Sequence, residues 1–341
     1  MKRIIQGILY ALLIISMLLQ AMVVVVLYQG IEDGQGMRFL VKKEAEEEPA
    51  VQEKKYRVVV KRLPVFGGAD VAANAQGEAV SELWRGDAVL LLEEGGSYSR
   101  VRLEDGSEGY VWFDCIEELT DEEFLGKKDK VIVLDAGHQG APNPDREPIG
   151  PGETDTKPKV ASGTQGVVSG QPENQLNLTI SLLVEALLEE QGYTAVMIRR
   201  TAEVNVSNVE RAMVANRIEA DAFIRIHADG SENPEASGSM TIISTSESKY
   251  DVVRYYEESK RLAAAVLNAY TQATGFHRKE IWERDNYSGI NWCTVPVTIL
   301  EMGYMTNREE DQKMQDPQMQ QKMAEGITQG VINYLEYSYV E

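Results

Sequence analysis

From residue 130 onward, the chain alternates short apolar runs with longer segments whose apolar residues recur with helical period. The apolar runs are VIVLD, YTAVMIRR, DAFIRIHADG, MTIIST and VPVTILEMG. This order of strand and helix signals is typical of an α/β fold with an open, mostly parallel sheet and helices on both faces. Ligands of such sheets bind beyond the carboxyl ends of the strands. The pattern therefore predicts both the architecture and the edge at which to look for a site.

The boundaries of the predicted helices are also visible in the sequence. One helix begins at Glu173, carries Leu176, Ile180, Leu183 and Leu187 on one face, and ends near residue 192. A second opens with Ser207 and Glu210, three residues apart as a capping box requires. The last begins at 316–317 (Asp-Pro), an N-cap residue followed by proline at the first helical position.

Three polar residues lie where predicted strands end. His138 follows VIVLD, His227 follows AFIRI, and Glu301 follows VPVTIL, while Glu173 opens the helix that runs back from the same edge. Two imidazoles and one carboxylate are the ligand set of a catalytic zinc ion, and a further glutamate can accept a proton from zinc-bound water. The third histidine, His277, follows no strand and is interpreted as a surface or packing residue.

Each of these residues also has an ordinary structural interpretation. A histidine at a strand end is often only hydrogen-bonded, and a glutamate in a first helical turn can serve the helix dipole. Glu301 could pair with Arg200 or Arg211 instead of acting in catalysis. The metal hypothesis is favoured because the four candidates converge on one edge of the predicted sheet in a chain with only three histidines.

The formal charge of −20 bears on possible partners. A chain with this charge offers no basic surface to release counterions from phosphates, which argues against a nucleic-acid partner. The two cysteines, Cys115 and Cys293, fall in different predicted domains, and we expect them to be unpaired packing residues.

The N-terminus predicts a membrane anchor. Residues 4–31 contain no charge, and a helix needs about 20 apolar residues to cross a bilayer. Lys2 and Arg3 precede the run, so the positive-inside rule places the rest of the chain outside the membrane, toward the cell wall. We interpret 1–31 as an uncleaved signal anchor, with a cleaved signal peptide and secretion as the alternative. Residues 32–55 read as a flexible, charged linker.

Residues 56–119 predict a small all-β domain. Apolar runs are separated by the turn signals EEGG and EDGSEG, and SRVRL alternates polar with apolar residues. The block GSYSRVRLEDGSEGYVWFDCIEEL resembles the closing hairpin of bacterial SH3-like domains, although RLPVFGGADVAA lacks the Asn-Val-Arg stretch usual in that family. The resemblance implies binding to stem peptides of peptidoglycan; a spacer barrel without a ligand is the alternative.

Five ordered blocks between residues 130 and 335 resemble the zinc-dependent N-acetylmuramoyl-L-alanine amidases of the type 3 family. They are VIVLDAGHQG, QPENQLNL, RAMVAN, ADAFIRIHADG and ILEMGYMTN. The resemblance implies a catalytic domain over 130–337 that hydrolyses the amide between N-acetylmuramic acid and L-alanine in peptidoglycan. It implies one Zn²⁺ ion held by His138, Glu173 and His227, with Glu301 as the catalytic general base.

The sequence departs from the family pattern in three places. AGH stands where the family has PGH, and RIHAD where it has SIHAN, so that Arg225 and Asp229 alter the charge of the predicted rim. The segment 141–172 is longer and richer in Gly and Pro than is usual, lacks helical period, and is interpreted as a loop over the cleft. A substrate lid and a tolerated surface insertion are both compatible with it.

Further residues are assigned supporting roles. Arg211 and Asn216, inside a predicted helix, fit scaffolding better than direct chemistry, and Asn291 in SGINW is a candidate substrate contact. Two other classes of function remain as alternatives. One is a non-catalytic wall-binding anchor, which the presence of all four critical residues disfavours. The other is a zinc peptidase acting on the stem peptide, which would tend to use closely spaced ligand pairs that this chain lacks.

Overall fold

A computed structural model describes residues 55–336, which belong to one compact unit. The predicted anchor at 1–31 and the linker up to residue 54 lie outside the described residues. Among the helices of 55–336, none combines the length and hydropathy that a membrane crossing requires.

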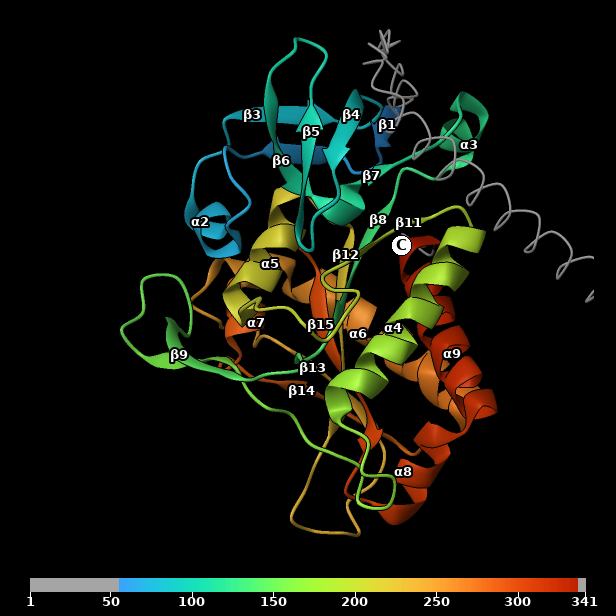
Figure 1. The fold of residues 1–341 in the computed structure, drawn as a ribbon. Coiled ribbons are helices and arrows are strands. Elements are labelled where there is room, and N and C mark those ends of the chain that lie inside the picture. The colour runs from blue at the N-terminus through green and yellow to red at the C-terminus, as the bar shows by residue number, and fades with distance from the viewer. Residues whose placement is uncertain (1–54, 337–341) are drawn as a thin grey trace, which may run out of the picture. The chain divides into compact units, whose positions relative to one another are not determined.

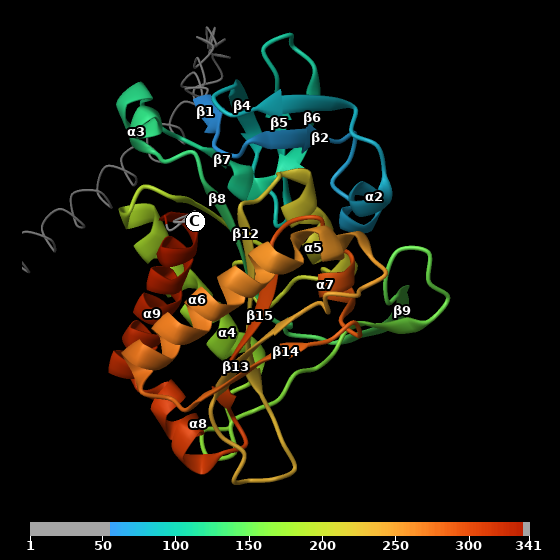
Figure 2. The same cartoon turned by 180° about the vertical axis from the view of Figure 1, so that it is seen from behind.

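A six-stranded sheet forms the centre of the C-terminal part, in the order β11-β8-β12-β15-β13-β14 (Figures 1 and 2). Neighbouring strands run parallel except for β13 and β15, which pair antiparallel. The sheet is therefore mixed, and the predicted α/β, mostly parallel architecture is confirmed in that form. The strands are β8 (Val131–Ala136), β11 (Thr194–Met197), β12 (Ala222–Asp229), β13 (Ser239–Ile243), β14 (Arg278–Glu283) and β15 (Val297–Tyr304).

Helices cover both faces of this sheet, as predicted. Ile132 and Leu134 of β8 pack into a core shared with α4, α6 and α9, whereas Val131 and Val133 pack into a second core that includes residues of α5. Alternate residues of one strand thus serve opposite faces, as the period of a β-strand requires. The helices are α4 (Glu173–Glu190), α5 (Asn208–Arg217), α6 (Tyr256–Thr274), α7 (Ser288–Asn291), α8 (Arg308–Gln315) and α9 (Pro317–Glu336).

Local sequence signals set the helix ends. The capping box of Ser207 and Glu210 is present in both directions at the start of α5, and Asp316 accepts a hydrogen bond from the Gln318 amide at the start of α9. The predicted face of α4 packs against the core, with Leu176 and Ile180 fully buried and Leu183 and Leu187 partly buried. Val184 and Leu188 are also fully buried, because α4 packs against both the sheet and α9.

The N-terminal described region is built of antiparallel strands, as predicted. A five-stranded sheet has the order β6-β5-β4-β1-β7, and β2 pairs with β3 in a separate two-stranded sheet. Cys115 of this region and Cys293 of the α/β part are both free and buried, as expected. The elements are β1 (Lys55–Val58), β2 (Arg62–Val65), α2 (Val71–Gln76), β3 (Ser81–Trp84), β4 (Ala88–Glu93), β5 (Tyr98–Arg102), β6 (Glu108–Trp112), β7 (Ile116–Glu117) and α3 (Asp121–Gly126).

The segment 141–172 contains regular structure, so its interpretation as a plain loop was wrong. Strands β9 (Asn143–Pro148) and β10 (Thr156–Val160) pair antiparallel as a hairpin that lies beside α5 and α7 (Figure 1). The hairpin is fixed to its surroundings: buried Glu147 accepts hydrogen bonds from the Val209 amide and the Ser288 hydroxyl. These polar contacts, rather than an apolar period, hold the two strands, which is why the sequence pattern did not indicate them.

Candidate active site

His138 lies in a tight turn directly after β8. Its φ of 61° is in the left-handed region, which a non-glycine residue adopts at some cost in strain. Buried arginines hold the turn from behind: Arg211 donates to the His138 carbonyl at 3.0 Å, and Arg199 donates to the Gly137 carbonyl at 3.0 Å. The turn therefore presents the imidazole in one fixed direction at the carboxyl edge of the sheet.

The residue before His138 is Gly137, and the close approach of the His227 ring requires a glycine there. A Cβ atom at this position would lie 2.3 Å from the His227 ring, so any larger residue would displace that ring. The two imidazoles meet edge to face, with ring centroids 4.8 Å apart. The glycine thus allows the rings of His138 and His227 to approach each other across neighbouring strands.

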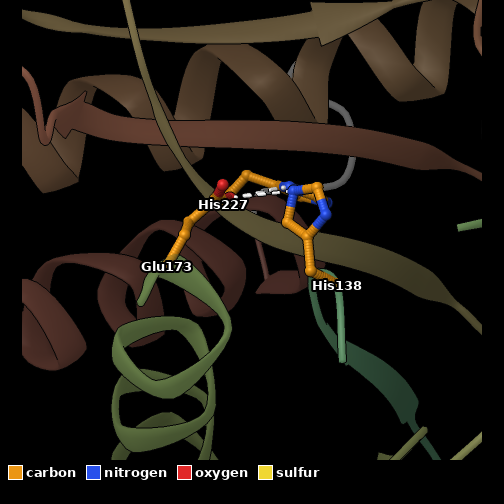
Figure 3. A group of neighbouring side chains, drawn as sticks. All are labelled: His138, Glu173 and His227. Atoms are coloured by element: carbon orange, nitrogen blue, oxygen red, sulfur yellow. Dashed lines mark hydrogen bonds and ion pairs between the residues drawn. The ribbon is translucent and has the colours of Figure 1, made fainter. Parts of the chain in front are cut away.

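Glu173, the first residue of α4, completes the cluster (Figure 3). Its Oε1 atom lies 3.2 Å from Nε2 of His138 and 3.2 Å from Nδ1 of His227. Its Oε2 atom accepts a hydrogen bond from the Thr164 amide at 2.9 Å, which fixes the carboxylate plane. One donor atom from each of the three residues lies within 4.8 Å of the others, a spacing that fits a metal ion. The structure thus brings together the three predicted ligands.

The hydrogen bonds of His138 support the metal interpretation. Its Nδ1 atom is 2.9 Å from the Ala161 carbonyl oxygen, which can only accept, so this nitrogen carries the proton. Nε2 is then the nitrogen that faces the carboxylate oxygen of Glu173, 3.2 Å away, and either a proton or a metal ion can join these two atoms. A ring nitrogen held by a backbone carbonyl is also the usual arrangement of a metal-binding histidine.

Burial and charge favour the unprotonated forms that metal ligands need. Burial lowers the pKa of His227 to about 4, and its Nε2 atom is buried without a hydrogen-bond partner. Burial alone would raise the pKa of Glu173, but the two imidazoles outweigh it and hold that pKa well below its usual range. A neutral imidazole and an ionised carboxylate are therefore the resting forms of these two groups.

Glu301 lies beside the cluster but is not one of its three members. It pairs in register with His227 on the neighbouring strand, and its Oε2 atom is buried without a hydrogen-bond partner. Burial, together with the negative charges of Glu173 and Asp229, raises the pKa of Glu301 well above its usual range. The alternative pairing with Arg200 or Arg211 is wrong, because those arginines bind other carboxylates.

Two cavities open on either side of this group and share His138, His227 and Glu301 in their walls. The larger, of about 460 Å³, also contacts Glu173 and is bordered by Asp229 and Glu232. The smaller, of about 290 Å³, lies between the β9–β10 hairpin and the start of α7. The candidate catalytic residues therefore stand between two spaces that could receive the two ends of a substrate.

A buried ion pair network behind the site was not found from the sequence. Asp135, fully buried in β8, accepts hydrogen bonds from Arg211 at 2.5 Å and from Arg225 at 2.8 Å. Burial alone would raise the pKa of Asp135, but the two guanidinium groups hold it well below its usual range. Arg225 was expected to alter the charge of the rim; it is buried and also lines the smaller cavity.

The remaining predicted residues have scaffolding roles. Arg211 supports the His138 turn as expected, and Asn216 bridges α5 to the Trp292 carbonyl and the Thr294 amide. Asn291 is only 1% exposed, and its side-chain amide donates to the carbonyls of Ile149 and Asp285. It lines neither cavity at the candidate site, so its assignment as a substrate contact is corrected to a link between α7 and the hairpin.

Fold and site together define an α/β protein with a His-Glu-His cluster suited to a metal ion at the carboxyl edge of its sheet. The family model of the N-acetylmuramoyl-L-alanine amidases (Amidase_3) matches residues 132–333. The chain belongs to this amidase family, and the predicted enzyme class is confirmed.

The chain is also similar to individual proteins and solved structures. The chain is 25% identical over 266 residues to the probable cell wall amidase LytH of Staphylococcus aureus, covering 76% of this chain and 79% of that one. It is 28% identical over 207 residues to the uncharacterized protein YqiI of Bacillus subtilis, covering 61% and 85%. Among solved structures, the amidase Ami1 of Mycobacterium smegmatis superposes with a TM-score of 0.56 at 26% identity, covering 61% of this chain and 98% of that chain.

Proposed function

We propose that this protein is a zinc-dependent cell-wall hydrolase that cleaves the amide between N-acetylmuramic acid and L-alanine. The observation that carries the proposal is the convergence of His138, Glu173 and His227, with Nε2 of His138 directed at the Glu173 carboxylate. Two imidazoles and one carboxylate form a ligand set that catalytic zinc commonly takes, with a position left for water. Family membership supplies the substrate class.

Zinc bound at these residues would lower the pKa of a bound water toward about 7 and polarise the amide carbonyl. Glu301 would accept a proton from the attacking water as the new C–O bond forms. It would then deliver that proton to the alanine nitrogen as the C–N bond breaks, so that a carboxylic acid and an amine are released. The position of Glu301 beside the cluster, with an unpartnered buried oxygen, supports this role.

The state of Glu301 depends on its surroundings. Burial and two neighbouring carboxylates favour its protonated form, whereas a divalent cation in the adjacent cluster favours its ionised form. A carboxyl group that is subject to both effects can exchange a proton with a neighbouring water, which is what a general base must do.

The proposed location is the outer face of the membrane, with 1–31 as a signal anchor, 32–55 as a flexible linker, 56–119 as an SH3-like domain and 130–337 as the catalytic domain. This arrangement makes peptidoglycan the main partner and gives nucleic acid no role. The antiparallel strands of 55–117 are compatible with the SH3-like assignment. If the anchor is cleaved, the protein is secreted instead.

The test is digestion of purified peptidoglycan by the full chain, with and without a chelator, followed by mass analysis of the fragments. An amidase releases peptides with a free L-alanine amino group and leaves the glycan strands intact. The appearance of a different new amine would identify a stem-peptide peptidase, and the release of none would identify a wall-binding anchor. Activity that resists chelation and is not restored by Zn²⁺ would refute the metal assignment.

A further inference from the structure

The smaller cavity has walls of unusual composition for an acidic protein. The β9–β10 hairpin contributes Lys157, Pro158 and Val160 to one side, and the segment at the start of α7 contributes Tyr287 to the other. Arg225 lies in the wall beneath. Two cationic side chains and several apolar groups thus face a space that reaches His138, His227 and Glu301.

Within residues 55–336, Lys157 forms no ion pair with a carboxylate. Its ammonium group donates to the Asn286 carbonyl and lies 5.4 Å from the centre of the Tyr287 ring. Burial lowers the pKa of Lys157. A half-buried ammonium group without a counter-ion is unfavourable, and this chain carries an excess of twenty negative charges from which a partner could have come.

Arg225 adds to the positive charge of the same wall. It shares Asp135 with Arg211, so two guanidinium groups are balanced by one carboxylate in that buried network. Its other polar contact is the neutral side-chain oxygen of Asn208. The network therefore leaves a net positive charge behind the smaller cavity.

The larger cavity has the opposite character. Asp229 and Glu232 border it, and no lysine or arginine is among the residues that line it. Hydroxyl-rich groups such as sugars suit its hydroxyl and carboxylate walls, whereas a carboxylate ligand would be repelled there. The two sides of the candidate catalytic residues therefore differ in charge, and the scissile amide of the proposed substrate lies between a sugar and an acidic peptide.

We propose that the smaller cavity is a subsite for the acidic residue that follows L-alanine in the stem peptide, with Lys157 as the ion-pair partner of its free carboxylate. This inference rests on the proposed function, because it takes the identity of the cleaved bond from it. The apolar walls of Val160 and Tyr287 contact the aliphatic part of the peptide. The sugar then occupies the larger cavity. The 141–172 insertion, by this reasoning, supplies one wall of the subsite.

The test uses two synthetic muramyl dipeptides that differ only in whether the second residue carries a free carboxylate or a carboxamide. We expect the full chain to prefer the carboxylate substrate by about tenfold in kcat/KM, equivalent to 1.4 kcal/mol. Lys157→Met removes the charge but keeps the length of the side chain, and should collapse this preference. Lys159→Met is the matched control, since Lys159 lies on the same strand but lines neither cavity, and it should keep the preference.

A binding measurement separates this inference from the proposed reaction. The full chain is titrated with the dipeptide L-Ala-γ-D-Glu and with its carboxamide, and affinity is followed by calorimetry. Tighter binding of the carboxylate peptide supports the subsite if this difference is lost in Lys157→Met and kept in Lys159→Met. Failure to cleave either muramyl dipeptide would count against the proposed function and would leave this binding result unaffected. Equal affinity for the two peptides, or equal loss in both variants, would overturn the subsite.

Discussion

Glu173 and Glu301 are two buried carboxyl groups in one site whose pKa values are shifted in opposite directions. The imidazoles beside Glu173 outweigh its burial and lower its pKa, whereas burial and neighbouring negative charges raise the pKa of Glu301. Two neighbouring acids whose pKa values are shifted apart in this way take different chemical roles. The ionised group suits a metal ligand, and the group with higher proton affinity suits proton transfer.

Replacement of these two residues should therefore have different consequences. Glu301→Gln keeps the size of the side chain but cannot take a proton, and we expect a loss of about 10²–10⁴ in kcat with zinc still bound. Glu173→Gln should lose the metal itself, because it removes a charged ligand. Zinc content measured by mass spectrometry, together with release of free L-alanine amino groups, distinguishes the two. Substantial turnover by Glu301→Gln would remove this residue from the mechanism.

The ion pair network at Asp135 leads to a prediction about stability and pH. Asp135→Asn leaves two buried guanidinium groups without their counter-ion, and we expect it to lower the free energy of unfolding by about 3–5 kcal/mol at neutral pH. Folding lowers the pKa of Asp135 from its value of about 3.9 in the unfolded chain. Its contribution is therefore complete above that pH and is lost as the pH falls toward the folded pKa.

Urea unfolding of both proteins between pH 7 and pH 3 measures this effect. The difference in unfolding free energy between wild type and Asp135→Asn should be largest at pH 7 and should shrink below about pH 4. Asp145→Asn is the control and should change little, because Asp145 is exposed and its side chain makes no ion pair in the part of the chain that the structure describes. A difference that stays constant over the whole range would mean that the charge of Asp135 is not what stabilises the fold.

At the scale of elements, α8 supports the site from a distance. Asp311, fully buried in this helix, accepts hydrogen bonds from the amides of Val168 and Ser169 and from the Ser169 hydroxyl. The same loop carries Thr164, whose amide fixes the Glu173 carboxylate. The orientation of a proposed metal ligand thus depends on a helix that holds the loop beside it.

Asp311→Ala should consequently weaken metal binding, although Asp311 is not itself a proposed metal ligand. The loop would lose three hydrogen bonds, and changes to groups that orient metal ligands typically cost about 10–100-fold in affinity. Zinc affinity measured by competition with a chelating dye tests this expectation. Glu309→Ala on the same helix is exposed and provides the control. Equal zinc affinity in wild type and Asp311→Ala would show that the loop orients Glu173 without help from α8.

The carboxyl edge of the sheet could be predicted from the sequence because buried apolar runs stop there at polar residues. His138 follows β8 as predicted, whereas β12 and β15 continue past His227 and Glu301, so these two residues lie near the ends of their strands and not beyond them. The partners of Asp135 could not be found in this way, because Arg225 is 90 positions away and the contact depends on the register of β8 against β12. The hairpin at Asn143–Pro148 was missed because polar anchors replace an apolar period.

On the scale of the whole molecule, the antiparallel sheet and the α/β part share one hydrophobic core, which includes Val101 and Val111 on one side and Val133 and Val196 on the other. Polar contacts cross the same boundary. The Trp112 indole donates to the Met197 carbonyl at 3.1 Å. A core shared by both parts predicts that they unfold together, although their sequence patterns predict separate domains.

Asp114 offers a direct test of this coupling. Its carboxylate accepts hydrogen bonds from the Met197 amide at 2.6 Å and from Arg200 at 2.9 Å, both in the α/β part. Calorimetry of the full chain should show one cooperative transition for the two parts. Asp114→Ala should shift this transition as a whole, with a loss of about 2–3 kcal/mol from charged hydrogen bonds. Glu104→Ala, exposed in the same antiparallel region, should leave it unchanged. Two transitions, of which only one responds to Asp114→Ala, would mean that the shared core does not couple the two parts.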